Sequence, residues 1–281
     1  MIEPEVLTSE VEGFSIQYLL YKNNENSNAK WLLLLHATGF FPWLWHPIAR
    51  ELYNFSIIVP YFCDHRVCDP ERGLSWYTLA QDLNKLLDSL AIAETFMVGH
   101  SMGGTIVTLA HYLKKRARKM ILIEPIFLPE IAYDTHISVK QHPLASKSIK
   151  RKNNWKDTEE AFSYLKSKSL FKNWHPEMLE IYITQGMKED HNASLTLTCP
   201  PQREAALFMG SQALNPWPLL SEIDIPVMIV EGEISGNKKY IDLKRAASLF
   251  SHSRYMEIKE AGHMIPMEKP QEIISLIQDF L

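Results

Sequence analysis

The chain has 281 residues, of which 46% are hydrophobic and 22% charged, as in an ordinary soluble globular protein. This length can form one large α/β domain or two small ones around a substantial core. The net charge of −4 disfavours nucleic acid as the main partner, because nucleic acids select basic surfaces. Three cysteines cannot all pair with one another, which suits a reducing compartment better than a disulfide framework.

The ends of the chain and its most apolar region bear on the cellular location of the protein. Residues 1–5 are acidic and lack the layout of a signal peptide, and residues 278–281 match no retrieval or peroxisomal address. Residues 31–45 are the most apolar region, but polar residues, glycine and proline interrupt it, so it is too short and too broken to span a bilayer. We therefore expect a cytoplasmic protein with no membrane span.

Short apolar runs alternate along the chain with longer amphipathic runs. Several short runs are apolar throughout, as in strands buried on both faces of a sheet. In chain order the expected strands are residues 14–21, 31–35, 55–59, 95–98, 119–123, 226–230 and 254–258. The expected helices are residues 45–53, 75–90, 102–115, 240–250 and 270–281. This alternation predicts an α/β fold with a mostly parallel central sheet and helices on both faces.

The alternation stops in the middle of the chain. Helical patterns at residues 158–168, 176–185 and 202–213 are joined there by polar connections, with no clear buried strand. Because ligands of open α/β sheets bind at the carboxyl ends of the strands, a block inserted between two strands can wall the pocket. We predict a core domain formed by residues 1–127 and 221–281, and an inserted helical cap formed by residues 128–220.

A Gly-x-Ser-x-Gly pattern occupies residues 99–103, directly between an expected strand and an expected helix. In that context the serine lies at a tight strand-to-helix turn, where glycines avoid clashes and the first amides of the helix face developing negative charge. A serine hydroxyl also needs an imidazole to accept its proton and an anion to orient that imidazole. The pattern therefore predicts Ser101 as a nucleophile. His263, in the loop after the last strand, is the candidate base.

Two backbone amides are needed to stabilise an oxyanion. Met102 begins the helix after Ser101, and Thr38 lies in the loop after the strand at residues 31–35, so these two residues are the candidates. His36, in the same loop, is interpreted as a scaffold for the loop rather than as a catalyst.

Residues 36–40, 99–104 and 262–270 together resemble the α/β-hydrolase superfamily, and in particular its capped esterase- or lipase-like serine hydrolases. The resemblance implies an oxyanion loop, a nucleophile elbow and a catalytic histidine at these three places. Two departures stand out. Ala37 replaces a glycine common in the oxyanion loop, and residues 60–66 differ from the usual Pro-Asp-x-Arg-Gly-x-Gly, so that loop should differ in shape.

The resemblance places the third triad member, an aspartate, at a position that holds Ser235 in this chain. Some relatives carry the acid at the end of the strand after the nucleophile helix, where this chain has Glu124. A carboxylate at the end of a buried strand is costly unless it is paired, which favours a functional reading. We therefore predict Ser101, His263 and Glu124 as the triad. Glu233 is the main rival for the acid, followed by the acidic side chains Glu231 and Asp242.

Four residues are candidates for lining the substrate pocket: Phe40, His100, Trp155 and Trp174. The basic group within residues 147–156 is interpreted as an exposed polar connection, in preference to a site that attracts an anionic substrate.

Cys63, His65 and Cys68 lack a standard zinc spacing, so no metal is expected, and no cofactor. The prediction is a monomeric or homodimeric serine hydrolase acting on a small-molecule carboxylic ester, thioester or lactone. A carbon–carbon bond hydrolase with the same triad and a non-catalytic small-molecule receptor stay open as alternatives.

Overall fold

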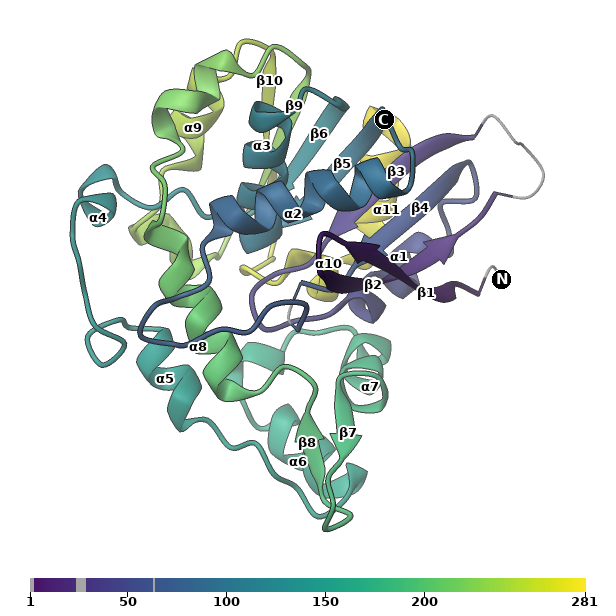
Figure 1. Ribbon diagram of the computed structural model, residues 1–281, viewed down its shortest axis with the longest axis vertical. Helices are drawn as coiled ribbons and strands as arrows, with labels where there is room; N and C mark the ends of the chain where they lie inside the picture. The colour runs from purple at the N-terminus through teal and green to yellow at the C-terminus, as the bar shows by residue number, and fades with distance from the viewer. Residues whose placement is uncertain (1–2, 24–28, 63) are drawn as a thin grey trace.

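The computed structural model describes residues 3–23, 29–62 and 64–281, and is built around an eight-stranded sheet (Figure 1). The strand order is β1-β2-β4-β3-β5-β6-β9-β10. From β4 to β10 all neighbouring strands are parallel, whereas the β1–β2 and β2–β4 pairs are antiparallel. The predicted fold class is confirmed. The strands are β1 (Glu5–Val11), β2 (Phe14–Tyr21), β3 (Lys30–Leu35), β4 (Phe55–Pro60), β5 (Thr95–His100), β6 (Ala117–Ile123), β9 (Val227–Gly232) and β10 (Ser253–Ile258).

Helices cover both faces of the sheet (Figure 1). One face packs against α2 (Trp76–Ser89), α3 (Met102–Leu113) and α9 (Leu243–Leu249), and the other against α1 (His46–Ala49) and α11 (Pro270–Phe280). In β3, Leu32 and Leu34 point to the α11 side, and Leu33 and Leu35 to the α2–α3 side. Burial on both faces explains why this strand is apolar without alternation. No helix in the described ranges is long and apolar enough to cross a bilayer.

The segment between β6 and β9 forms a group of short elements, drawn in teal and green, most of which lie in the lower part of Figure 1. A two-stranded hairpin lies among these helices. The sequence does not predict it, because its strands are too short to show a periodic pattern. The elements are α4 (Glu130–Tyr133), α5 (Ala145–Lys150), α6 (Thr158–Lys166), η2 (Ser169–Phe171), α7 (Pro176–Thr184), β7 (Met187–Glu189), β8 (Leu195–Leu197), α8 (Pro201–Met209), η3 (Gly210–Gln212) and η4 (Trp217–Glu222).

Strand β1 was also missed by the sequence analysis. Only Val11 is buried in this edge strand, so no apolar run marks it. A tight turn sets its pairing with β2, because Glu12 and Gly13 have φ values of 45° and 91°. Positive φ at both turn positions matches the right-handed twist of the strands that it joins, and glycine adopts such values without steric strain.

Candidate active site

Ser101 lies at a strained turn between β5 and α3. Its φ of 55° and ψ of −118° are rare for a residue with a side chain. A side chain at Gly99 would collide with the carbonyl oxygen of Gly103, and one at Gly103 with that of Leu35. The Ser101 amide donates to the carbonyl of Ile123 at 2.9 Å. The glycines therefore allow a turn that presents the hydroxyl at the carboxyl edge of the sheet.

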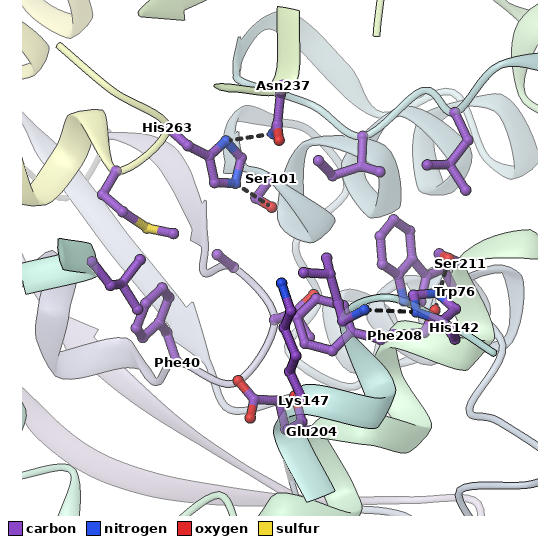
Figure 2. Close-up of a pocket in the computed structure, with 18 of the residues that line it drawn as sticks. Phe40, Trp76, Ser101, His142, Lys147, Glu204, Phe208, Ser211, Asn237 and His263 are labelled. Carbon is purple, nitrogen blue, oxygen red and sulfur yellow. Dashed lines mark hydrogen bonds between the residues drawn. The ribbon is translucent and has the colours of Figure 1, made fainter. Parts of the chain in front are cut away.

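His263 joins this hydroxyl to a carboxylate. Its Nε2 lies 3.0 Å from Ser101 Oγ, and its Nδ1 lies 2.9 Å from Glu124 Oε2 (Figure 2 shows the first contact). An ionised carboxylate can only accept a hydrogen bond, so Nδ1 carries the ring proton. Nε2 is then left to accept the proton of the serine hydroxyl. The three side chains come from the ends of β5 and β6 and from the loop after β10.

Glu124 is almost fully buried, with 1% of its side chain exposed, but its carboxylate has partners. Besides His263, the Gly232 amide donates to Oε1 at 2.7 Å and Ser235 Oγ donates to Oε2 at 2.8 Å. These bonds compensate for removing the charge from water. Glu124 also has a positive φ of 49°, so both it and Ser101 are held in strained conformations at adjacent strand ends.

The three rival carboxylates lie elsewhere. Glu233 is exposed and accepts from the Glu260 amide at 2.8 Å. Glu231 accepts from the hydroxyl of Tyr255, and Asp242 caps α9 by accepting from the Arg245 amide at 2.9 Å. The structure therefore brings Glu124, and none of these three, to His263.

Two further residues contact His263. The Asn237 amide nitrogen lies 2.9 Å from His263 Nδ1 (Figure 2). Because Nδ1 carries a proton, the Asn237 amide can bond to it only through its oxygen, which a half-turn of the amide presents. His100 Nε2 donates to the His263 carbonyl at 2.8 Å. Sequence analysis had no signal for Asn237, since it follows no recognisable motif. His100, predicted to line the pocket, is not among the described residues that do so and contacts the His263 backbone instead.

The loop after β3 lies against the start of α3. His36 is buried and links this loop to the next one: its Nε2 accepts from the Phe62 amide at 3.1 Å, and Nδ1 lies 2.9 Å from the Ala37 carbonyl. Burial lowers the pKa of His36 to about 4, so the ring is neutral and acts as a scaffold. Thr38 lines the cavity beside Ser101. Met102 is the first residue of α3, where backbone N–H groups have no partner within the helix.

A cavity of about 390 Å³ opens in front of Ser101 and His263 (Figure 2). Its walls come from the loops at the strand ends, from the start of α2 and from residues between 126 and 211. The cavity is mainly apolar, as in most small-molecule sites. The apolar side chains that line it are Ala37, Phe40, Trp76, Ile126, Leu128, Leu144, Leu170, Phe208 and Met264.

Phe40 lines this cavity as expected, but Trp155 and Trp174 are not among the described residues that do. Both indoles are buried. Trp155 packs 5.9 Å from the ring of Tyr164, centroid to centroid. Trp174 packs 4.7 Å from the ring of Phe171 and 5.6 Å from that of Phe40, so it joins the inserted segment to the loop after β3. Aromatic rings stabilise mainly through burial, so both indoles contribute to packing rather than to the cavity wall.

Within the described ranges, no group of three or more histidine, cysteine or acidic side chains is arranged to hold a metal ion. Cys63 lies outside the described residues. His65 instead bonds through Nε2 to Asp82 at 3.1 Å, and Cys68 is a half-buried free thiol.

Comparisons with known proteins agree with this architecture. The chain is 22% identical over 251 residues to a Haemophilus influenzae protein named as an esterase/lipase, covering 84% of this chain and 81% of that protein. It is 23% identical over 256 residues to carboxylesterase YbfK of Bacillus subtilis, covering 89% and 79%. The crystal structure of E-2-(acetamidomethylene)succinate hydrolase superimposes with a TM-score of 0.81 at 18% identity, covering 99% of this chain and 98% of that one.

The sequence profile of the alpha/beta hydrolase family matches residues 32–276, which is most of the chain. The match includes the three segments that carry Ser101, Glu124 and His263. The chain therefore belongs to the alpha/beta hydrolase family and is a hydrolytic enzyme.

Proposed function

We propose that this enzyme is a serine hydrolase that cleaves a carboxylic ester, or a related thioester or lactone, through an acyl-enzyme on Ser101. One observation carries the proposal: Ser101 Oγ, both ring nitrogens of His263 and Glu124 Oε2 form a continuous chain with contacts of 3.0 and 2.9 Å. Such a chain activates a serine hydroxyl at neutral pH. The names of the two similar bacterial proteins, an esterase/lipase and a carboxylesterase, support the same reaction class.

The reaction follows from the direction of these hydrogen bonds. His263 Nε2 takes the hydroxyl proton while Ser101 Oγ attacks the substrate carbonyl carbon. Glu124 stabilises the imidazolium that forms, because its carboxylate accepts the Nδ1 proton. His263 then gives its proton to the leaving group, and the ester bond breaks. A water molecule, deprotonated by His263, attacks the acyl-enzyme and releases the acid.

The oxyanion of each tetrahedral intermediate needs donors that are already in place. The amides of Met102 and Thr38 are the proposed pair. Thr38 lines the same cavity as Ser101. The Met102 amide lies at the first residue of α3, where the helix dipole favours negative charge. The division into a core of residues 1–127 and 221–281 and a cap of residues 128–220 belongs to the same proposal. In that arrangement the cap shields the intermediate from water.

A hydrolysis assay tests the proposal. Wild type, Ser101→Ala, Glu124→Gln and Glu233→Gln are compared on 4-nitrophenyl esters of increasing acyl length. We expect Ser101→Ala and Glu124→Gln each to lower kcat by about 10⁴-fold, and Glu233→Gln to match wild type. Equal loss in Glu233→Gln would move the acid to that position instead. Circular dichroism of each variant checks that the fold is kept.

A second measurement separates an inactive receptor from a hydrolase of narrow specificity. A fluorophosphonate probe reacts with an activated serine whatever the natural substrate is. We expect labelling of wild type and none of Ser101→Ala. Labelling without turnover of any ester would favour the carbon–carbon bond hydrolase, whereas failure to label would favour a receptor and contradict the proposal.

A further inference from the structure

Several polar side chains line the cap side of the cavity, and most of them have partners. Arg151 Nη1 forms an ion pair with Glu204 Oε2 at 2.9 Å, and Arg151 Nη2 donates to the carbonyl of Cys199 at 3.2 Å. Burial raises the pKa of Glu204, and Arg151 and Ser148 offset only part of this effect. An ionised Glu204 cancels the charge of Arg151, and a protonated one leaves that charge in place. The pair therefore adds no net negative charge to the cavity.

His142 is neutral in this wall. Its Nδ1 accepts from the amides of Leu144 and Ala145, each at 3.2 Å, and so caps the start of α5. Burial lowers the pKa of His142. Glu124, the acid behind His263, is not among the residues that line the cavity. These two residues therefore do not set the charge of the cap side.

Lys147 differs from all of these residues. It lies on α5, four positions before the C-cap residue Arg151, and both residues line the cavity. Figure 2 shows the Lys147 side chain reaching from this helix into the cavity, opposite Ser101 and His263. None of the ion pairs and hydrogen bonds formed by the described residues involves its ammonium group. Lys147 thus gives the cap side of the cavity a positive charge that no acidic side chain of the described residues pairs with, and this charge lies opposite Ser101.

We propose that the natural substrate carries a carboxylate, and that Lys147 binds it while Ser101 attacks the ester carbonyl. Lys147 is exposed, so its ammonium group is hydrated while the cavity is empty. A substrate carboxylate in the cavity gives that group a charge-assisted hydrogen bond, which a neutral substrate of the same length cannot form. Lys147 thereby selects anionic esters over neutral ones of the same length. This inference rests on the proposed hydrolase function and specifies its substrate class.

The test compares two pairs of esters, because the carboxylate can lie on the acyl or the alcohol side. The first pair is mono-4-nitrophenyl adipate and 4-nitrophenyl hexanoate, and the second is 4-carboxyphenyl hexanoate and phenyl hexanoate. The measured quantity is the ratio of kcat/KM for the anionic ester to that for the neutral one. Comparing this ratio between variants cancels the different intrinsic reactivities of the esters.

We expect Lys147→Gln to lower this ratio by about tenfold in at least one pair, the lower end of what hydrogen bonds to charged groups contribute, since the lysine is partly solvated. Lys147→Glu should lower it further, because it places a like charge beside the carboxylate. Lys150→Gln is the matched control. It removes the same charge from the same helix, but Lys150 does not line the cavity in the described structure, so its ratio should stay at the wild-type value.

Two kinetic results would overturn the inference: a ratio that Lys147→Gln leaves unchanged for both pairs, or an equal fall of the ratio in Lys150→Gln. A binding experiment gives a third such result, if the Kd does not rise. Calorimetry on Ser101→Ala, which cannot turn over substrate, gives the Kd of 4-carboxyphenyl hexanoate and of mono-4-nitrophenyl adipate. Adding Lys147→Gln should raise one of these values about tenfold. Wild type that hydrolyses all four esters without a Lys147 effect contradicts only the inference. Absence of both turnover and fluorophosphonate labelling contradicts the hydrolase function itself.

Discussion

Ser235 Oγ donates a hydrogen bond to Glu124 Oε2 across 2.8 Å. Ser235 holds the position at which the resembled hydrolases carry their triad aspartate, and it is buried. Because β6 and β9 are adjacent parallel strands, their carboxyl ends bring Glu124 and Ser235 together. In this chain the usual acid position therefore supports a carboxylate supplied by the neighbouring strand.

This contact predicts a role for Ser235 in positioning the carboxylate. Ser235→Ala removes one donor to a buried charge, and hydrogen bonds to charged groups contribute about 1.5–3 kcal/mol. We expect kcat on a 4-nitrophenyl ester to fall at least about tenfold with KM unchanged, since the hydroxyl does not line the cavity in the described structure. Ser235→Thr keeps the hydroxyl and should retain most of the activity. An unchanged kcat in Ser235→Ala would contradict this role.

His100 is predicted to position His263 without titrating in the working range. Burial, and then the neighbouring His263, lower the pKa of His100 to about 3. We expect His100→Leu to lower kcat about tenfold, because the 2.8 Å bond to the His263 carbonyl is lost. His100→Gln offers an amide donor and should recover part of that loss. Neither variant should shift the pH–rate profile between pH 5 and 8, so a shifted profile would show that His100 titrates there.

The parts of the site that lie at strand ends could be predicted from the sequence. The positions of Ser101, Glu124 and His263 follow from where strands end, and parallel strands bring those ends to one edge. The structure places all three in contact, including Glu124, which a search at the usual acid position would have missed.

The sequence predicts less of the inserted segment, and in particular not which of its side chains face the cavity. Its helices are placed by contacts between residues far apart in sequence, such as Arg151 with Glu204, and local patterns do not encode those contacts. The sequence therefore does not separate pocket residues from packing residues: Trp155 and Trp174, both predicted for the pocket, are buried and are not among the described residues that line it. Lys147 is exposed, as the sequence predicts, but it also lines the cavity, and the sequence does not reveal which side of α5 faces that cavity.

Buried His36 predicts a loss of stability in mild acid. Burial lowers its pKa from 6.5 to about 4, so between these values the unfolded chain binds a proton that the folded protein does not. Stability from this group is therefore complete above about pH 6.5 and falls as pH drops toward 4. Urea denaturation at pH 7 and pH 5 measures the effect. His36→Gln should be less stable at pH 7 but lose less stability on acidification, and an equal loss would contradict the assignment.

The Arg151–Glu204 pair predicts the opposite dependence on pH when it is broken. Arg151→Met leaves the Glu204 carboxyl, whose side chain is 10% exposed, without its cation. We expect a loss of about 2 kcal/mol, less than for a fully buried pair because Arg151 is 26% exposed, and the double variant Arg151→Met/Glu204→Gln should recover most of it.

The sign of the pH effect distinguishes this mechanism from simple loss of packing around the arginine stem. Burial already raises the pKa of Glu204, and removing Arg151 takes away the main opposing influence. The folded protein then binds a proton that the unfolded chain releases above its pKa of 4.5, so stability rises as pH falls. Urea denaturation should show the gap between Arg151→Met and wild type narrowing from pH 8 to pH 5.5. A gap that stays constant over this range would assign the loss to packing instead.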